Sequence, residues 1–373
     1  MPAGDLAEHL AELRLVDHHA HGAFTVDLPR AEFEIHLNEA SPEPVPDWLT
    51  HFDSQLGFAI RRWCAPLLDL PPHAPADEYW RRRTELGHAE VTGRFLRAAG
   101  VSDWLLDTGF GTVLDEQGMA AASGGRAHEI VRLESVAEQV TAGAGRDYAD
   151  EFGARLAKAT SQAVGVKTIL AYRCGFDIDL SRPQPRAVAE AAEKWIAAGT
   201  PRLTDPVLLR HGLHAAVELG LPIQVHTGYG DRDLDLDRAN PVRLLDFLRL
   251  PEVAGVPVLL LHCYPYHREA GYLAQAFTNV YFDVGLGLNH TGVRAAAIVA
   301  ESFELAPFAK QLYSSDAWGP PELHFLGATL WRKAIAETFG RWVADGDWSA
   351  ADAVRVAGMV GRDNARRVYG LER

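Results

Sequence analysis

The second half of the chain repeats one pattern of apolar and polar positions. A short segment rich in Val, Ile and Leu is followed by a polar turn and then by a helix of roughly ten to twenty residues. These apolar segments lie at 164–173, 221–228, 256–265, 279–286 and 311–318. Short and almost continuously apolar strands that alternate with helices predict a parallel sheet covered on its outer face. Five such units in a row indicate a closed barrel.

The first half of the chain supplies three further strands, although its pattern is less regular. We predict them at 13–21, 101–110 and 128–135. With the five units of the second half they make eight, which is the strand number of a TIM-type (β/α)8 barrel. We therefore expect an α/β fold in which residues 1–373 form a single barrel domain.

A long segment at about 29–100, rich in Pro, Trp and Arg, separates the first two predicted strands. A connection of this length usually contains helices of its own or has a function. We interpret it as a helical insertion over the barrel mouth, where it caps the site and contributes to substrate choice. The alternative is an arm used in dimerisation, which leaves a homo-oligomer open.

Composition and net charge limit the classes of protein to which this chain can belong. The chain has a formal net charge of −14 and no Lys/Arg run, which argues against nucleic acid as a partner. The longest apolar stretch, near 256–261, is too short to span a membrane. Its three cysteines are widely spaced and form no CxxC pair, and the first residues do not have the pattern of a signal peptide. We expect a cytoplasmic protein that acts on a small molecule.

Polar residues end four of the predicted strands. His19 and His21 follow the first apolar run, His226 the fifth, His262 the sixth and Asp316 the eighth. In a TIM-type barrel the C-terminal strand ends form the reactive face, so these side chains should meet at one point. A single His at a strand end is more often a hydrogen-bonded structural residue. Four strands that end this way predict a metal site, because imidazole and carboxylate are ligands of Zn²⁺.

Several longer motifs accompany these residues: VDHHAH, YRCGFDI, IQVHTGYGDRDLDL, VLLLHCYPYHREAGYLA, VYFDVGL and YSSDAWGPPELHFLGA. Together they resemble the amidohydrolase superfamily, and more narrowly its amidohydrolase 2 branch, which includes the amidohydrolase-like module of glutamine-synthetase-fused proteins. The resemblance implies that His19, His21 and His226 are metal ligands. It also implies that His262 is a ligand or stabilises charge, and that Asp316 contacts the metal and transfers protons.

Lys167 determines how many metal ions are expected. Some branches of the superfamily have a carbamylated lysine at strand four that bridges two metals, and the GVK sequence resembles that arrangement. The predicted strand continues to Arg173, however, which leaves Lys167 deep in the barrel. The alternative is an unmodified lysine paired with a buried carboxylate. One or two ions of Zn²⁺ are therefore expected, with Mn²⁺ or Fe²⁺ as other choices.

The expected chemistry follows from these groups. A bound Zn²⁺ lowers the pKa of water from about 15.7 toward 7 and so provides hydroxide at neutral pH. Asp316 can take up the second proton, and His262 can stabilise the developing oxyanion. No G-x-S-x-G motif supports a serine nucleophile. The predicted reaction is hydrolysis of an amide-type C–N bond.

The predicted substrate is a small carboxylate-bearing amide, such as a γ-glutamyl amide, by analogy with the glutamine-synthetase-fused proteins. Arg173 could bind its carboxylate in a bidentate pair, or could form an internal ion pair with a loop acid. Tyr172, Tyr229 and Trp318 are expected to line the pocket. One alternative function is a metal-dependent decarboxylase of an unsaturated or aromatic acid. The other is a barrel that binds a ligand without turnover.

Overall fold

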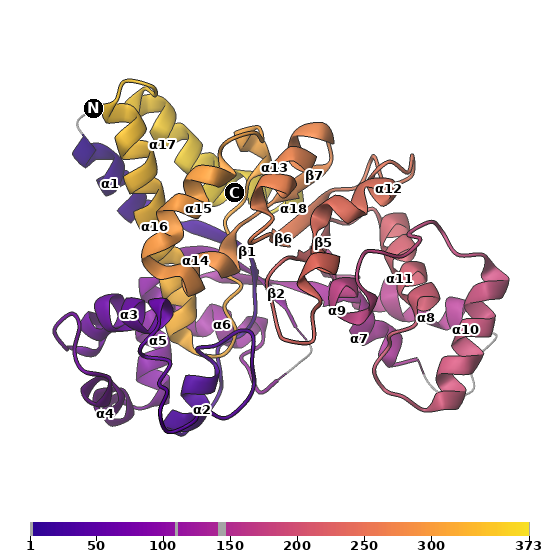
Figure 1. The fold of residues 1–373 in the computed structure, drawn as a ribbon, viewed down its shortest axis with the longest axis horizontal. Helices are drawn as coiled ribbons and strands as arrows, with labels where there is room; N and C mark the ends of the chain where they lie inside the picture. The colour runs from indigo at the N-terminus through magenta and orange to yellow at the C-terminus, as the bar shows by residue number, and fades with distance from the viewer. Residues whose placement is uncertain (1–2, 109–110, 141–146, 373) are drawn as a thin grey trace.

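The computed structural model describes residues 3–108, 111–140 and 147–372, and within them the sheet has seven parallel strands. The strands are β1 (Leu15–Ala20), β2 (Val101–Asp107), β3 (Arg126–Arg132), β4 (Gly165–Thr168), β5 (Ile223–Thr227), β6 (Val258–His262) and β7 (Val280–Phe282). Each strand pairs with its neighbour in chain order. Positions 109 and 110 of the second predicted strand lie outside the described residues. Figure 1 shows the strands in the middle of the molecule and helices around them.

Residues 311–317 join the two edges of this sheet. The N–H of Leu312 donates to the carbonyl of Phe282 in β7 at 3.0 Å. On the other side, the N–H of His18 in β1 donates to the carbonyl of Tyr313 at 3.1 Å, and the N–H of Asp316 donates to the carbonyl of His19 at 3.0 Å. These bonds close the ring, so the fold is an α/β barrel of the TIM type.

The closing segment occupies the place expected for an eighth strand, but the prediction of a regular strand over 311–318 was wrong. The N–H of Ser315 donates at 3.0 Å to the carboxylate of Asp17 instead of to a strand carbonyl. Asp316 has a φ of 49°, in the left-handed region. An L-residue in that region cannot continue an extended ladder, so the pairing becomes irregular here.

The fourth strand is shorter than its apolar run. β4 ends at Thr168, and Leu170–Cys174 form the short helix α9. The Thr168 hydroxyl oxygen accepts the N–H of Leu170 at 3.1 Å, a local bond that turns the chain out of the sheet. The run ILAY suits either a strand or a helix. The prediction that this strand reaches Arg173 was therefore wrong, and Lys167 lies near the C-terminal end of β4.

Helices cover the outer face of the barrel. They are α1 (Ala3–Glu12), α6 (Glu116–Ser123), α7 (Leu133–Glu138), α8 (Tyr148–Ala159), α10 (Pro185–Ala198), α11 (Pro206–Leu219), α12 (Leu245–Leu248), α13 (His267–Ala276), α14 (Gly285–Thr291), α15 (Ala295–Ser302), α16 (Pro321–Ala344), α17 (Ala350–Gly358) and α18 (Asn364–Tyr369). Local sequence explains where they begin. In α11, for example, Pro206 occupies the first position and the Asp205 carboxylate accepts the N–H of Val207 at 2.8 Å. Across the described residues, none of the helices is apolar over a length that would cross a membrane.

Four further helices lie between β1 and β2: α2 (Arg30–Ile35), α3 (Gln55–Ala59), α4 (Ala76–Leu86) and α5 (His88–Ala98). In Figure 1, α2, α3 and α4 group together on the side of the molecule opposite α10. Arg83 of α4 forms an ion pair of 2.7 Å with Glu322 of α16, and the Tyr79 hydroxyl donates to the same carboxylate at 3.0 Å. Because the Glu322 side chain is completely buried, these contacts attach the segment to the barrel.

Asp17, under the closing segment, should make stability depend on pH. Burial raises the pKa of its carboxyl from 3.8 to about 7, although the bond from Ser315 opposes this rise. The folded chain therefore binds more protons than the unfolded chain between about pH 4 and pH 7, and the free energy of unfolding falls as pH rises through this window. Asp17→Asn should remove this part of the fall in urea titrations at the two ends of the window. Identical pH slopes for the two proteins would contradict the prediction.

The ion pair between Arg83 and Glu322 should be necessary for stability. Arg83→Met leaves the buried carboxylate without its cation and should lower the free energy of unfolding by about 3–5 kcal/mol. The double variant Arg83→Met/Glu322→Gln removes the charge as well and should regain about half of that loss. Urea denaturation measures both changes. A double variant no more stable than the single variant would show that the uncompensated charge is not the cause.

Candidate metal centre

The C-terminal end of β1 presents two histidines to the barrel mouth. His19 is completely buried, and only 6% of His21 is exposed. The register between β1 and β2 shifts between Asp17 and Ala20, and such irregularities re-aim side chains next to functional sites. His21 Nδ1 lies 2.9 Å from the carbonyl oxygen of Asp107. A carbonyl only accepts, so Nδ1 carries the proton and Nε2 presents its lone pair to the mouth.

His226, the next-to-last residue of β5, and His262, the last residue of β6, lie beside this pair. The ring centroids of His226 and His262 are 4.7 Å apart, and those of His262 and His19 are 5.4 Å apart. His262 has a φ of 66°. Left-handed backbone is uncommon in residues other than glycine, and it occurs preferentially at functional sites. Four imidazoles from three strands thus form one buried group.

The Asp316 carboxylate lies next to three of these imidazoles. Its Oδ1 lies 2.9 Å from His19 Nε2 and 3.6 Å from His21 Nε2, and its Oδ2 lies 3.3 Å from His262 Nε2. Like His262, Asp316 has a left-handed backbone conformation. The hydrogen bond from its N–H to the His19 carbonyl fixes where the carboxylate lies. One carboxylate therefore faces three imidazoles.

Lys167 reaches the same point from β4. Its Nζ lies 2.9 Å from His19 Nε2 and 3.3 Å from Asp107 Oδ2. Arg132, at the end of β3, contacts the Asp107 carboxylate with a shortest distance of 2.5 Å. Asp107 thus lies between two cations. The lysine is paired with a buried carboxylate, which is the arrangement expected of an unmodified side chain.

Burial keeps the imidazoles neutral. It lowers the pKa of His21 to about 3. It also lowers the pKa of His19, His226 and His262 well below 6.5, and the Lys167 charge acts in the same direction. Near pH 7 these rings carry lone pairs, which is the form in which histidine binds a metal ion.

The two carboxylates of the cluster have opposite protonation tendencies. Burial raises the pKa of Asp316 well above its usual value, although Lys167 lowers it. Burial would also raise the pKa of Asp107, but Arg132 and Lys167 outweigh it and lower this pKa to about 2. Asp107 is therefore ionised near pH 7. Asp316 is the carboxylate of the pair whose protonated form burial favours.

These residues fit a divalent metal ion. The ligand atoms of His19, His262 and Asp316 all lie within 4.8 Å of one another, as do those of His19, His21 and Asp107. His226 Nε2 and both ring nitrogens of His262 are buried and have no hydrogen-bond partner among the described residues. An unsatisfied buried polar group costs about 1–3 kcal/mol, so a cation that such nitrogens bind would offset a real penalty. Neutral imidazole with carboxylate is the donor set of zinc sites.

Three of the residues predicted to bind substrate lie at different distances from the cluster. Tyr172 has its ring centroid 4.4 Å from that of His226, and its hydroxyl accepts the N–H of Asp231 at 3.2 Å. The ring of Tyr229 meets that of His290 at 5.6 Å. The indole of Trp318 packs against His36, in the segment after β1, at 4.9 Å. Tyr172 is thus in ring contact with a histidine of the cluster.

The Arg173 side chain forms an ion pair away from the histidine cluster. Its guanidinium forms an ion pair of 2.9 Å with Glu138 at the end of α7, and only 9% of its side chain is exposed. This is the internal ion pair with an acid that the sequence left open. A role in substrate binding stays a prediction.

Two acidic residues face the cluster from neighbouring loops. Burial and Asp231 together raise the pKa of Glu39 to about 7, while Lys167 lowers it, so all three groups share one electrostatic environment. Burial and the nearby Asp233 raise the pKa of Asp231. An ion pair between Arg232 and Glu43 connects the two loops. The space in front of the cluster is therefore acidic.

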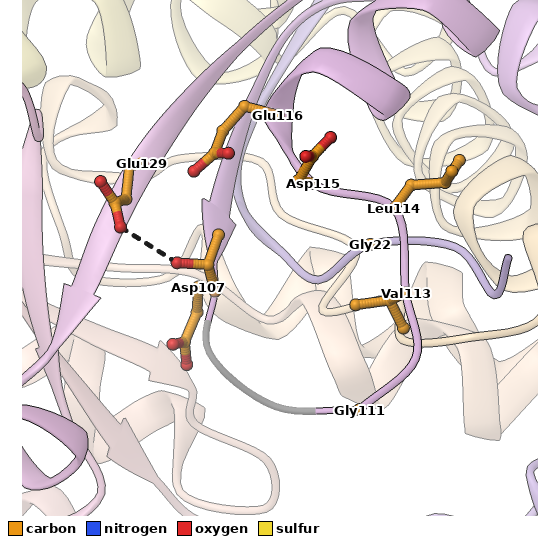
Figure 2. Close-up of a pocket in the computed structure, with 9 residues that line it drawn as sticks. Gly22, Asp107, Gly111, Val113, Leu114, Asp115, Glu116 and Glu129 are labelled. Atoms are coloured by element: carbon orange, nitrogen blue, oxygen red, sulfur yellow. Dashed lines mark hydrogen bonds between the residues drawn. The ribbon is translucent and has the colours of Figure 1, made fainter. Parts of the chain in front are cut away.

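A cavity of about 450 Å³ adjoins the centre on the far side of β2. It is lined by Gly22, Asp107, Thr108, Gly111, Val113, Leu114, Asp115, Glu116 and Glu129. Figure 2 shows that Glu116 and Glu129 point into the space between β2 and β3, whereas the Asp107 carboxylate points away from them. Asp107 thus lines this cavity and also contacts Lys167 of the cluster.

Four residues at the centre were not predicted from the sequence: Asp107, Arg132, Gln224 and Glu39. Asp107 and Arg132 could have been found, because each is the last residue of its strand, as His262 is of β6. Gln224 lies within β5 at a buried position that resembles ordinary core. Glu39 lies in the long segment after β1, and only the fold brings it to the mouth. Strand ends carry a local signal, whereas these last two contacts depend on tertiary structure.

Known proteins resemble this chain in sequence and fold. The profile of the family described as Amidohydrolase matches residues 111–371. Protein fluG of Emericella nidulans is 33% identical over 228 residues, which are 56% of this chain but only 26% of that protein. The chain thus matches about a quarter of the length of this relative.

Solved structures extend the likeness to the whole chain. A protein described as a metal-dependent hydrolase, from Lactobacillus casei, has a TM-score of 0.84 and 26% identity over 98% of this chain and 97% of its own. A uronate isomerase of Bacillus halodurans has a TM-score of 0.66 and 15% identity over 99% of this chain and 96% of its own, a likeness of fold alone. The family match covers well over half of the sequence and confirms the resemblance seen in its motifs: the chain belongs to the amidohydrolase family.

Proposed function

We propose that this protein is a metal-dependent hydrolase that cleaves an amide-type C–N bond in a small carboxylate-bearing substrate. The observation that carries the proposal is that His19, His21 and His262 face the Asp316 carboxylate, while the ring of His226 lies against that of His262. The likeness to a metal-dependent hydrolase across nearly the full chain supports it.

His19, His21, His226 and Asp316 would hold the metal, with His262 as a further ligand or a charge-stabilising group. Zn²⁺ suits this donor set, and Mn²⁺ or Fe²⁺ are other choices. Such an ion, when bound, polarises a substrate carbonyl and lowers the pKa of water to about 7. Whether Lys167 is carbamylated determines whether the site holds one metal ion or two. As an unmodified ammonium it supplies the positive charge that a second ion would bring.

The side chains of the protein supply the proton transfers. Asp316 has a raised pKa and faces three imidazoles, so it can accept a proton during attack on the carbonyl carbon and return it to the leaving nitrogen. His262 lies beside it at 3.3 Å, where its ring N–H can donate to the oxygen that becomes negative. Asp107 stays ionised and holds Lys167 at the cluster.

The acidic space in front of the cluster favours a C–N bond. Cleavage of an amide releases an amine, which takes up a proton near pH 7. Asp231 adds to burial in raising the pKa of Glu39, and Asp233 adds to burial in raising the pKa of Asp231, which shows that acidic groups cluster beside this space. An ammonium product would offset their negative charge. The carboxylate-binding role of Arg173, with Tyr172, Tyr229 and Trp318 lining the pocket, is part of this proposal.

We further propose that residues 29–100 form a helical insertion that caps the mouth. Glu39 brings a charge from this segment to the centre, and the Arg232–Glu43 ion pair joins it to the loop after β5. The ion pair between Arg83 and Glu322 anchors it to α16.

The proposed reaction is tested with a panel of γ-glutamyl amides and aromatic acids, measuring amine and CO₂ release by zinc-loaded enzyme. We expect amine release from the amides. Asp316→Asn should reduce it by about 10²–10⁴-fold, because the proton-transfer group is lost. Full activity of that variant would remove Asp316 from the mechanism. Release of CO₂ without amine would identify a decarboxylase instead.

Metal binding should stabilise the folded chain. Zinc at about 100 times its Kd should raise the free energy of unfolding by about 2.7 kcal/mol relative to chelator-treated protein. The double variant His19→Ala/His21→Ala should show no such rise. Metal analysis of protein purified without chelator measures occupancy directly. Less than about a tenth of an equivalent of Zn, Mn or Fe would favour a barrel that binds its ligand without a metal.

A further inference from the structure

A chain of buried hydrogen bonds leads from the metal centre to the C-terminal helix. His19 Nδ1 lies 2.8 Å from the side-chain oxygen of Gln224. The amide nitrogen of Gln224 donates to the His18 carbonyl at 2.7 Å and to the Tyr369 hydroxyl at 2.7 Å. His18, His19 and Gln224 are completely buried, and Tyr369, the last residue of α18, is 6% exposed. Water therefore does not replace these partners.

The donor and the acceptor of each hydrogen bond in this series can be assigned from one group, the His18 carbonyl. The His18 carbonyl can only accept, so the NH₂ group of Gln224 must face it. The Gln224 oxygen must then face His19, and it too can only accept. His19 Nδ1 therefore carries the proton, and His19 Nε2 presents its lone pair toward Asp316 and Lys167.

The same assignment extends to the neighbouring strand. The Tyr369 hydroxyl accepts from Gln224, so its own proton can go to His18 Nδ1 at 3.1 Å. His18 Nε2 then donates to Asp283 at 3.0 Å. The other carboxylate oxygen of Asp283 accepts a hydrogen bond from the backbone N–H of His262 at 3.1 Å. One network thus reaches the strands of both His19 and His262.

We propose that Gln224 is a positioning residue that fixes the tautomer and ring orientation of His19, with Tyr369 and the His18 carbonyl holding its amide in place. Nothing in the hydrolytic chemistry above uses these groups. The inference rests on the proposed metal centre, because its consequence is a metal-binding lone pair that is already in place before the ion arrives. Partners of this kind typically change metal affinity by about 10–100-fold.

The experiment measures zinc affinity by competition with a chelator, so it does not depend on knowing the substrate. Gln224→Met keeps the volume but removes the acceptor, and it should weaken zinc binding by about 10–100-fold. Gln224→Glu restores an acceptor for His19 and should bind zinc within about threefold of wild type, even if its carboxylate facing the His18 carbonyl lowers stability. If Gln224 acted only through the stability of the fold, the zinc affinities of the variants would instead follow the order of their stabilities.

Gln311→Met is the matched control. Gln311 is also buried, and its side-chain amide has no hydrogen-bond partner among the described residues, so this variant should keep wild-type affinity. If Gln224→Met does not fold, Tyr369→Phe takes its place and should weaken zinc binding in the same direction by a smaller factor. Wild-type affinity in the variant tested, or equal losses in Gln224→Met and Gln224→Glu, would overturn the proposal. A wild-type chain that binds no zinc would instead refute the metal centre itself.

Discussion

The hydrogen bond from the Asp316 N–H to the His19 carbonyl is the contact on which the site depends. It is one of the bonds between β1 and residues 311–317 that close the barrel, and it places the Asp316 carboxylate beside the His19 imidazole. A regular eighth strand would have directed this side chain differently. The irregular backbone at Asp316, with its left-handed φ, therefore belongs to the site as well as to the fold.

Burial then sets the chemistry of the groups that closure brings together. It keeps the imidazoles neutral and raises the pKa of Asp316, while Lys167 and Arg132 keep Asp107 ionised. Desolvation raises the pKa of both carboxylates, but the net shift of Asp107 is downward because this residue lies between two cations. In the proposed mechanism this difference gives Asp107 a structural charge and Asp316 the proton-transfer role.

The sequence predicted the parts of this centre that depend on strand ends. The positions of His19, His21, His226, His262 and Asp316 after apolar runs were enough to place them at one rim, because parallel strands in a barrel all end on the same face. The depth of Lys167 could not be judged, since the break after Thr168 depends on a side-chain bond within an apolar run. Gln224 and Glu39 could not be predicted either. One occupies a position that resembles core, and the other comes from a long segment whose path only tertiary packing determines.

This arrangement destabilises the folded chain before any ligand binds. His226 and His262 have buried ring nitrogens without hydrogen-bond partners among the described residues, and His262 and Asp316 have strained backbone. By contrast, His19 and His18 are satisfied by Gln224, Tyr369 and Asp283 on the side away from the mouth. The unsatisfied ring nitrogens thus belong to the histidines of β5 and β6, whereas the network holds those of β1. Such a division is expected if the inner network holds the rings rigid, so that the free energy of a bound cation offsets the local penalty without further rearrangement.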